Sequence, residues 1–331
     1  MNLVTGATGH IGNVMVRNLL ARGEDVRALV LPDEDHSPLE EMNVECVEGN
    51  VLKPDTLRKA LQGVKNVYHL AGIISIMPGK NELVHKVNVE GTRNIIKESV
   101  RANINRLIYT SSIHALARVP HGITIDESIP FDPEHAISAY DRSKAEASLE
   151  VVKACKEGLD AVIVCPTGVI GPYDYRRSEV GEIILESVQE KPQFYVDGAY
   201  DFVDVRDVAQ GHILACEKGR TGEVYILSGE NISVPGLVET LWNITGRGFK
   251  RLKIPLSLAR FSALFTPIYY RLAKAKPRFT PYSLATLASN SVISHAKALR
   301  ELGYSPRPIR ESLEDTVEWF RENRHLLVNP T

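Results

Sequence analysis

Several features that would place this chain in a specialised class of protein are scarce or missing. Its 331 residues include four cysteines, at positions 46, 155, 165 and 216, with no Cys-x-x-Cys pair and no histidine partners in sequence. Scattered cysteines of this kind fit reduced, packed thiols, and we expect no metal site. The formal net charge of −2 provides no basic surface, so we expect no nucleic-acid partner.

Long apolar segments are also missing. The sequence has no run of eighteen apolar residues, so we expect no segment that crosses a membrane. The first apolar strand begins at residue 2, which leaves no room for a signal peptide. These two absences predict a cytoplasmic protein.

What is present is ordinary globular composition over a long chain. Hydrophobic residues make up 44% and charged residues 24% of the sequence, as in typical soluble domains. A chain of 331 residues exceeds the length at which one hydrophobic core normally stops growing. We therefore expect one large α/β domain and a smaller lobe.

From residue 1 to about 170, short apolar strands alternate with helical patterns. This alternation predicts an α/β fold, namely a Rossmann-type doubly wound parallel sheet with a smaller, mainly helical C-terminal substrate lobe. The expected strands cover residues 2–4, 25–31, 44–48, 66–70, 106–109 and 160–164, and the expected helices cover 14–22, 54–61, 82–102 and 137–156.

After residue 172 the pattern becomes mixed. Residues 207–217 and 224–227 have the pattern of a return to the large sheet. We therefore predict a dinucleotide-binding domain over 1–170, rejoined by 200–228, and a substrate-binding lobe over 171–199 and 229–331. The expected strands are 194–196, 202–205 and 224–227, and the expected helices are 179–190, 208–217, 234–245, 255–275, 281–288, 294–302 and 309–323.

A glycine-rich segment, Thr5-Gly-Ala-Thr-Gly-His-Ile-Gly12, lies between the first apolar strand and the first helical pattern. A phosphate cradle belongs at such a strand-to-helix turn, because the helix amides and dipole face the anion. Alone, this pattern could equally be an ordinary glycine-rich turn.

Two later motifs give the glycine-rich segment its context. Tyr140 and Lys144 are four residues apart, so both emerge from one helix face, and the ammonium would lower the pKa of the phenol from roughly 10. Ser111 and Ser112 end a strand, and ligands bind outside the carboxyl ends of parallel strands. One of these serines is expected only to cap the next turn. The order of the three motifs predicts a nicotinamide-dependent enzyme.

The segment 255–275 is apolar and aromatic, and basic residues lie near its end and just after it, at 274, 276 and 278. One interpretation is a helix packed over the substrate pocket. The other is an interfacial helix that makes peripheral contact with a membrane and takes a lipophilic substrate from it, with its basic flank meeting anionic headgroups. Both interpretations imply an apolar side to the substrate.

With these motifs in place, the chain resembles the extended short-chain dehydrogenase/reductases (the NAD-dependent epimerase/dehydratase family) over essentially its full length. Within that family it is most similar to the dihydroflavonol-reductase and 3β-hydroxysteroid-dehydrogenase-like members. The segments that carry the resemblance are residues 5–12, 69–72, 88–92, 110–112, 126–128, 140–144, 166–172 and 204–209.

The resemblance implies a role for each matching residue. Tyr140 would be the acid/base, Lys144 would bind the nicotinamide ribose and lower the pKa of the tyrosine, and Ser112 would hydrogen-bond the reacting oxygen. The remaining cofactor-binding residues that the resemblance implies are Gly6, Thr8, Gly9, His10, Ile11, Gly12, Asn50, Val51, Leu70, Ala71, Gly72, Asn88, Thr110, Pro166, Gly168 and Val169.

The cofactor is expected to be NAD or NADP, and the choice is made at the end of the second strand. Leu31 stands where NADP-using relatives often carry arginine, and Val30 stands where NAD-using relatives often carry aspartate. Asp33, followed by Glu34 and Asp35, would repel a 2′-phosphate. The prediction therefore leans to NAD, with Leu31 and Asp33 at the selecting position.

Differences from the family's sequence motifs narrow the range of expected substrates. Ile113-His114 replaces the Asp-Glu pair of sugar-nucleotide dehydratases, and residues 115–117 and 167–169 differ from the nucleotide-sugar epimerases. We expect an NAD(P)-dependent oxidoreductase that interconverts a secondary alcohol and a ketone on a bulky, partly apolar small molecule. A nucleotide-sugar epimerase with tightly held NAD and a non-catalytic dinucleotide sensor remain alternatives.

Three residues are candidate substrate contacts: Ser111, His114 and Tyr173. His114 could instead be a structural hydrogen-bonding residue, as lone loop histidines commonly are. By resemblance, the helices over 82–102 and 137–156 are expected to pair with their copies in a homodimer.

Overall fold

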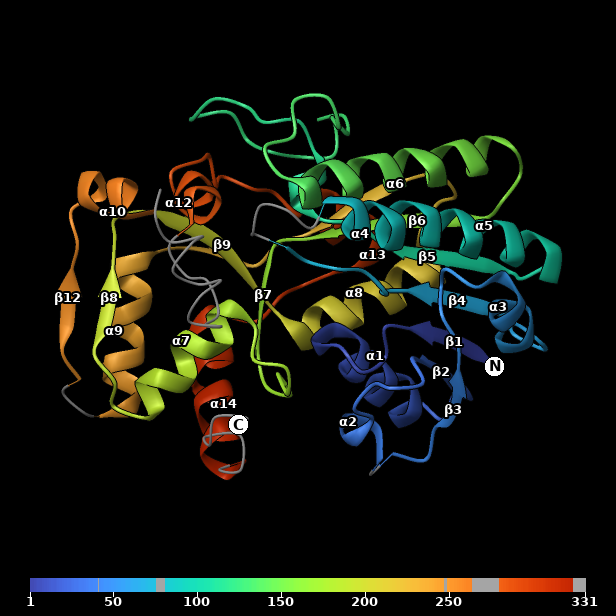
Figure 1. Cartoon of the computed structure of the whole chain (residues 1–331). Helices are drawn as coiled ribbons and strands as arrows, with labels where there is room; N and C mark the ends of the chain where they lie inside the picture. The colour runs from blue at the N-terminus through green and yellow to red at the C-terminus, as the bar shows by residue number, and fades with distance from the viewer. Residues whose placement is uncertain (41, 76–80, 247–248, 264–279, 324–331) are drawn as a thin grey trace.

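The computed structural model describes residues 1–40, 42–75, 81–246, 249–263 and 280–323, which form two lobes (Figure 1). The larger lobe is built on a seven-stranded sheet whose strands run parallel in the order β10-β6-β5-β4-β1-β2-β3. The predicted doubly wound fold is confirmed. The strands are β1 (Asn2–Thr5), β2 (Val26–Val30), β3 (Glu45–Glu48), β4 (Asn66–His69), β5 (Arg106–Thr110), β6 (Ala161–Pro166) and β10 (Val224–Leu227).

Both faces of this sheet are covered by helices, with α5 and α6 on one face and α1 and α8 on the other (Figure 1). Successive side chains alternate between the faces: Leu107 and Tyr109 of β5 join one core, and Ile108 joins the other. Burial on both faces explains why an inner strand such as β6 is a nearly continuous apolar run. The helices are α1 (His10–Ala21), α3 (Pro54–Ala60), α5 (Gly91–Ala102), α6 (Ala139–Lys156), α8 (Val205–Lys218) and α13 (Ala296–Leu302).

The helix expected over 82–102 is not one regular helix. It consists of α4 (Asn81–His85), a π-helical segment η1 (Lys86–Glu90) and α5. Asn88 lies in the π-helical segment, and its side-chain amide bonds the backbone of Ile73 through both its oxygen and its nitrogen. Such segments are often found at functional sites.

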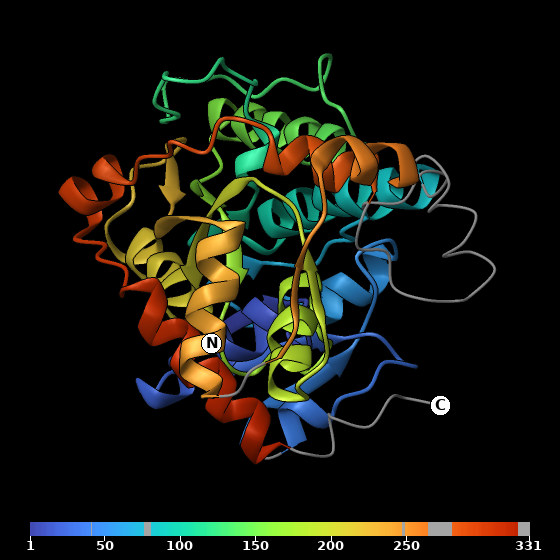
Figure 2. The ribbon, with the colours of Figure 1, turned by 90° about the vertical axis from the view of Figure 1, so that its left-hand side faces the viewer.

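The smaller lobe holds a three-stranded sheet, β11-β9-β7, and a two-stranded sheet, β12-β8. Figure 2, which looks at this lobe, shows α9 and α14 in front of the large sheet. These helices and α7 bury one hydrophobic core. The elements are β7 (Gly168–Ile170), β8 (Gln193–Tyr195), β9 (Ala199–Asp204), β11 (Glu230–Ser233), β12 (Arg251–Lys253), α7 (Glu179–Val188), α9 (Val234–Thr245), α10 (Leu256–Ala263), α12 (Pro281–Leu287) and α14 (Ile309–Glu322).

The chain passes between the lobes more than once. β10 pairs with β6 at the edge of the large sheet, and α8 packs against α1. At the start of the predicted segment 200–228, β9 pairs with β7 and β11 in the smaller sheet. The sequence of β9 does not show which strands it pairs with. The proposed domain boundaries stay a prediction.

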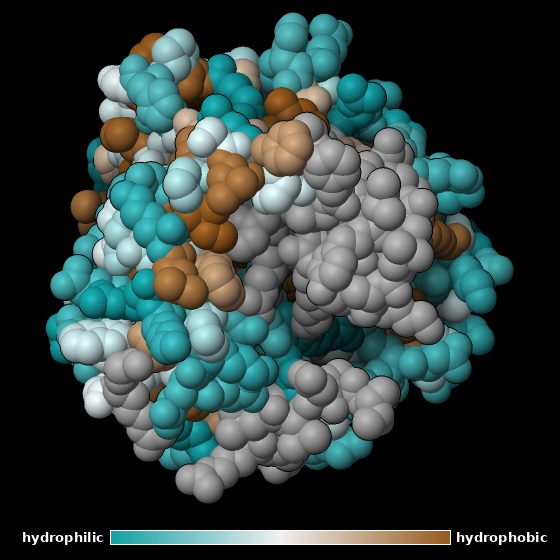
Figure 3. Space-filling view, turned by 60° about the vertical axis from the view of Figure 1, so that its left-hand side comes forward, coloured by the Kyte–Doolittle hydropathy of each residue, from teal (hydrophilic) through white to brown (hydrophobic). Residues whose placement is uncertain are grey.

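The elements that the sequence did not predict are the short ones: α2 (Ser37–Glu40), β7, β11 and β12, each of three or four residues. Of the helix expected over 255–275, α10 accounts for the first part, and residues 264–275 lie outside the described residues. Among the residues described, no helix has the length and apolar character needed to cross a membrane. Figure 3 shows apolar side chains exposed on the small-lobe face.

Candidate active site

The glycine-rich turn joins β1 to α1 and leaves no room for side chains at two of its glycines. Gly6 has φ +69°, and a Cβ there would lie 2.8 Å from the backbone nitrogen of Ala71. A Cβ on Gly12 would lie 2.0 Å from the Gly6 carbonyl oxygen. The N-cap residue of α1 is Gly9, so no side chain caps the helix, and its first turn has no acidic residue. The exposed amides and the close backbone approach fit a pyrophosphate.

Buried hydroxyl and imidazole groups hold this turn against the end of β4. Thr5 Oγ1 lies 2.8 Å from His69 Nδ1 and accepts a hydrogen bond from the Ala71 amide at 3.1 Å. His69 Nε2 lies 3.1 Å from Thr92 Oγ1. Burial lowers the pKa of His69 to about 3, so its ring is neutral and structural. The network fixes Ala71 beside the glycine-rich turn.

The residues expected to contact the adenosine part of the cofactor lie just after β2 and β3. The Asn50 side-chain oxygen accepts a hydrogen bond from the Leu52 amide at 2.8 Å, which leaves it one further lone pair. Val51 packs against Gly91. Leu31 and Asp33 are exposed. It is Glu34 whose carboxylate lies beside the glycine-rich turn, where the Arg176 guanidinium donates to both Glu34 and Thr8.

Asn88 connects the loop after β4 with the catalytic helix. Its side-chain nitrogen donates to Ser143 Oγ at 2.9 Å in α6 and to the Ile73 carbonyl at 3.0 Å. A Cβ on Gly72 would lie 3.2 Å from the Asn88 side-chain oxygen and 3.6 Å from Lys144 Nζ. The predicted cofactor residues Gly72 and Asn88 therefore adjoin the predicted catalytic lysine.

Lys144 is buried, with 6% of its surface exposed, and its Nζ donates to the Thr110 carbonyl at 2.7 Å. Burial lowers the pKa of Lys144 to about 8. The Thr110 hydroxyl lies 2.7 Å from His212 Nε2, and burial lowers the pKa of His212 to about 4. His212 Nδ1 meets the Val208 carbonyl, so the ring is neutral and Nε2 accepts from Thr110. This histidine fixes the strand end that holds Lys144.

Tyr140 is 9% exposed and lies next to Ser112. Burial raises the pKa of Tyr140 to about 12, and a hydrogen bond from the Ser112 side chain acts to lower it. Lys144 is not among the groups that shift the pKa of Tyr140 in this arrangement, and its role in tuning the tyrosine stays a prediction. The desolvation of a buried phenol dominates, and the Lys144 ammonium is directed to the Thr110 carbonyl.

The two serines after β5 have different surroundings. Ser112 accepts from the His114 amide at 3.2 Å and so caps the short 3₁₀ turn η2 (Ile113–Ala115), and its side chain lies next to Tyr140. Ser111 Oγ lies 2.6 Å from Ser148 Oγ, inside the contact between β5 and α6. Of the two, Ser112 is the one placed beside the phenol of Tyr140, the predicted acid/base.

Aromatic side chains from both lobes surround this point. His114 Nε2 lies 2.6 Å from the Tyr200 hydroxyl, with the rings stacked at 5.8 Å. The Tyr282 ring meets His114 edge-on at 6.2 Å. Burial lowers the pKa of His114. Sequence reasoning missed Tyr200 and Tyr282, because they belong to β9 and α12 and no local motif marks them.

Residues after Gly171-Pro172 hold the glycine-rich turn to the small lobe. His10 Nε2 lies 3.0 Å from the Pro172 carbonyl. Tyr173 has φ +69°, and its ring lies under the Arg17 guanidinium at 4.4 Å and near Trp319 at 6.1 Å. The described ring contacts of Tyr173 are therefore packing contacts between the lobes. Its expected role as a substrate contact stays a prediction.

The remaining residues that were predicted to bind the cofactor lie near the groups described above. Pro166 ends β6, and Gly168 and Val169 begin β7, where a Cβ on Gly168 would lie 2.7 Å from the Tyr200 and Phe202 rings. Leu70 donates its amide to the Thr5 carbonyl at 3.3 Å, and Ile11 packs against the core of α1 and α8.

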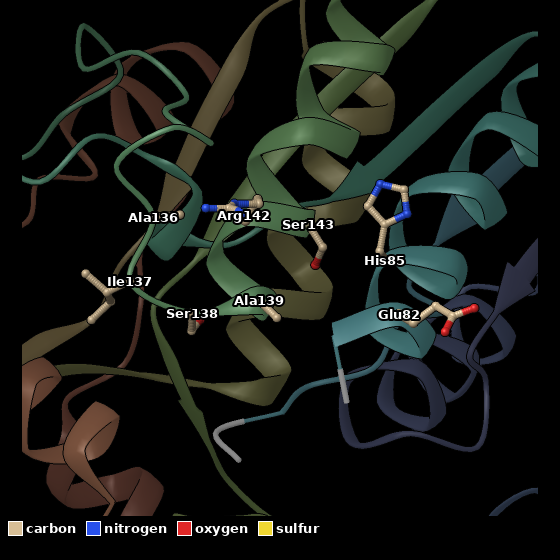
Figure 4. A pocket seen from close by; sticks show the side chains of 8 residues that line it. All are labelled: Glu82, His85, Ala136, Ile137, Ser138, Ala139, Arg142 and Ser143. Carbon is tan, nitrogen blue, oxygen red and sulfur yellow. The ribbon is translucent and has the colours of Figure 1, made fainter. Parts of the chain in front are cut away.

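A pocket of about 450 Å³ lies between α4 and the first turn of α6 (Figure 4). Figure 4 shows Glu82 and His85 on one side and Ile137, Ser138 and Arg142 on the other. Ala139, Arg142 and Ser143 share a helix face that differs from the face of Tyr140 and Lys144. The pocket therefore adjoins the catalytic helix without containing its phenol. The complete lining is Glu82, His85, Ala136, Ile137, Ser138, Ala139, Arg142 and Ser143.

The parallel sheet, the glycine-rich turn and the buried Tyr140–Lys144 pair together define a dinucleotide-dependent enzyme. Residues 2–228 match the NAD dependent epimerase/dehydratase family, and the chain belongs to this family. Its cofactor is NAD or NADP.

Two similar proteins and one solved structure span nearly the whole chain. The chain is 38% identical over 324 residues to sterol demethylase protein B of Methylococcus capsulatus, covering 97% of this chain and 98% of that protein. It is 30% identical over 352 residues to 3beta-hydroxysteroid-dehydrogenase/decarboxylase isoform 1 of Arabidopsis thaliana, covering 96% and 79%. The crystal structure of gox2253 superimposes with a TM-score of 0.85 at 37% identity, covering 98% of each chain.

Proposed function

We propose that this protein is an NAD(P)-dependent oxidoreductase that interconverts a secondary alcohol and a ketone on a bulky, partly apolar ring substrate. The observation that carries the proposal is the position of the buried Tyr140 next to Ser112, beside the aromatic group of His114, Tyr200 and Tyr282. Tyr140 and Ser112 would transfer the proton, and the rings of His114, Tyr200 and Tyr282 would provide a flat apolar surface for the substrate.

A carbinol carbon that loses hydride also loses a proton from its oxygen, so the site needs a proton carrier within hydrogen-bond reach. The bound nicotinamide would accept or donate the hydride. Tyr140, as a neutral phenol, would give its proton to the forming alkoxide in reduction and recover it in oxidation. Ser112 would donate to the same oxygen where charge develops.

Lys144 would contribute to the same reaction by orienting the cofactor. Its Nζ lies next to Gly72 and is held by the Thr110 carbonyl. From there its ammonium would hydrogen-bond the ribose hydroxyls of a nicotinamide nucleotide bound along Ala71 and Gly72. This contact would orient the cofactor relative to Tyr140 without itself transferring the proton.

The nature of the substrate is inferred from the surrounding rings. Tyr200, Phe202 and His114 stack or meet edge-on, and Gly168 gives them space. Flat aromatic surfaces bind fused aliphatic or aromatic rings better than a phosphorylated sugar. Two relatives whose names refer to sterols or hydroxysteroids support the same class of substrate.

The proposal is tested by incubating the purified protein with oxidised or reduced nicotinamide cofactor and a panel of substrates. The panel holds polycyclic 3β-hydroxy and 3-keto compounds, flavanonols and UDP-glucose. We expect cofactor turnover with a polycyclic alcohol or ketone, and a loss of about 10²- to 10⁴-fold in Tyr140→Phe. Turnover of UDP-glucose to an epimer, with no net change in cofactor, would favour the epimerase alternative and contradict the proposal.

A further inference from the structure

Glu34 and Arg176 form an ion pair across the mouth of the glycine-rich turn. Arg176 lies between β7 and α7 in the small lobe, and Glu34 lies in the loop after β2. The Arg176 Nη2 donates to Glu34 Oε1 and, at 2.8 Å, to Thr8 Oγ1. The other Glu34 oxygen accepts from the Leu31 amide at 3.3 Å. The pair therefore ties the small lobe to two segments of the dinucleotide-binding domain.

The surroundings of the two side chains differ. The Glu34 side chain is 17% exposed, and that of Arg176 is 51% exposed. Burial alone would raise the pKa of the Glu34 carboxyl, but the hydrogen bonds from Arg176 and Thr8 outweigh it and hold that pKa below its ordinary value. Glu34 is therefore ionised at neutral pH. Its position depends on a partner from the other lobe.

Glu34 lies where proteins of this fold bind the adenosine ribose of the cofactor. In a doubly wound sheet, the end of the second strand and the first turn flank that ribose, and an acidic group there bonds the 2′-hydroxyl. The 2′-phosphate of NADP would bring negative charge against the Glu34 carboxylate. Arginine is in turn the side chain best suited to bind a phosphate, through two parallel hydrogen bonds.

We propose that Glu34 selects NAD and holds Arg176 back from a 2′-phosphate, so that Arg176 is a latent NADP ligand supplied by the small lobe. With the charge of Glu34 removed, Arg176 keeps its contact with Thr8 and gains a 2′-phosphate as its partner. The selecting residue is then Glu34 rather than Asp33. The inference rests on a dinucleotide in the glycine-rich turn and does not depend on the substrate.

The test measures equilibrium binding by calorimetry, with NADH and NADPH and with the fragments 5′-AMP and 2′,5′-ADP, which differ by the 2′-phosphate alone. The variants are Glu34→Gln, Arg176→Met and the double variant. Asp33→Asn is the matched control, because it removes one negative charge from the same loop at an exposed side chain. A thermal unfolding transition confirms that each variant is folded.

We expect the wild-type protein to bind NADH more tightly than NADPH. Glu34→Gln shifts the ratio of the two dissociation constants toward NADPH by about 10- to 100-fold, as hydrogen bonds to charged groups allow. The double variant loses this gain, and Asp33→Asn leaves the ratio within about twofold of wild type. The fragments 5′-AMP and 2′,5′-ADP follow the same order.

Three results would overturn the inference. The first is a wild-type preference for NADPH, the second is an unchanged ratio in Glu34→Gln, and the third is a gain in NADPH binding that survives removal of Arg176. If wild-type protein bound neither dinucleotide, the cofactor assignment would fail together with the inference. If it bound NADH but turned over no alcohol or ketone, the proposed function would fail and this inference would stand.

Discussion

The hydroxyl of Tyr282 donates a 2.7 Å hydrogen bond to the carboxylate of Asp141, the residue that follows Tyr140 in the chain. Asp141 is 2% exposed and lies in the first turn of α6, whereas Tyr282 belongs to α12 of the small lobe. The bond therefore fastens the catalytic helix to the small lobe. It also offsets the cost of a buried carboxylate beside the phenol.

Removing this donor should destabilise the protein. We expect Tyr282→Phe to lower the free energy of unfolding by about 1–3 kcal/mol, because a buried charged acceptor loses its partner. Asp141→Asn keeps an acceptor oxygen and should cost less. Urea unfolding of both variants and of the double variant gives the coupling energy between the two residues. A coupling energy near zero would show that the bond does not contribute to stability.

The expected homodimer is testable on the outer surfaces of α5 and α6. Val100 of α5 is 57% exposed and Leu149 of α6 is 43% exposed, which is a high exposure for large apolar side chains. We propose that these helices pair with their copies in a second subunit. Sedimentation should give a dimer for wild type and a monomer for Leu149→Arg, while Val292→Arg, at another exposed valine, stays dimeric. A wild-type monomer at micromolar concentration would contradict the proposal.

The membrane interpretation of 255–275 is testable on the part that the structure describes. Leu258 and Phe261 are 56% and 63% exposed and lie three residues apart on α10, with the exposed Arg260 beside them. If the membrane interpretation holds, the protein should cosediment with vesicles containing anionic lipid, and Leu258→Ser/Phe261→Ser should bind them at least about tenfold more weakly, since each side chain gains roughly 1.5–3 kcal/mol on burial. Equal partitioning of the two proteins would favour the pocket-lid interpretation.

The features that could be predicted from the sequence are those that depend on residues close together in the chain. The glycine-rich turn and the Tyr140–Lys144 spacing are local patterns, and the structure places them at one end of one sheet. The substrate side depends on contacts between distant segments: His114 and Tyr200 are 86 residues apart, and Asp141 and Tyr282 are 141 apart. No periodicity encodes such pairs.

Electrostatics was the least predictable part from sequence. A lysine four residues from a tyrosine suggests a lowered phenol pKa, but burial decides the sign, and burial is a property of the complete fold. For the same reason, Asp33 could not be distinguished from Glu34. Only the path of the loop after β2 shows which carboxylate reaches Thr8 and Arg176.

Ser112 and Ser111 provide a matched pair for testing the proton-transfer site. The Ser112 hydrogen bond lowers the pKa of Tyr140, whereas Ser111 is bonded to Ser148. Alcohol oxidation needs the phenolate, so its rate should rise with pH toward about 12, and Ser112→Ala should move this rise to higher pH. At a fixed pH we expect about a tenfold loss of kcat/KM for oxidation. Ser111→Ala should leave the pH profile in place, and equal shifts in both variants would contradict the assignment.

The buried Lys144, which we propose binds the cofactor, should lower the stability of the folded protein. Burial lowers its pKa to about 8 in the folded protein, against roughly 10.4 in an unfolded chain. Between these values the unfolded chain binds more protons, so wild-type stability rises with pH across this window. Below it, the penalty of the buried charge is fully present.

Lys144→Met removes that charge. We expect a gain of about 1–3 kcal/mol in the free energy of unfolding near pH 7, less the bond to the Thr110 carbonyl, together with loss of cofactor-dependent turnover. The gain should shrink as the pH rises from about 8 to roughly 10.4, because the wild-type lysine becomes neutral there. Lys153→Met, at an exposed position on the same helix, is the control and should show no such pH dependence. Urea unfolding at both ends of the window checks the sign, and a gain that grows with pH would rule out a buried ammonium as its cause.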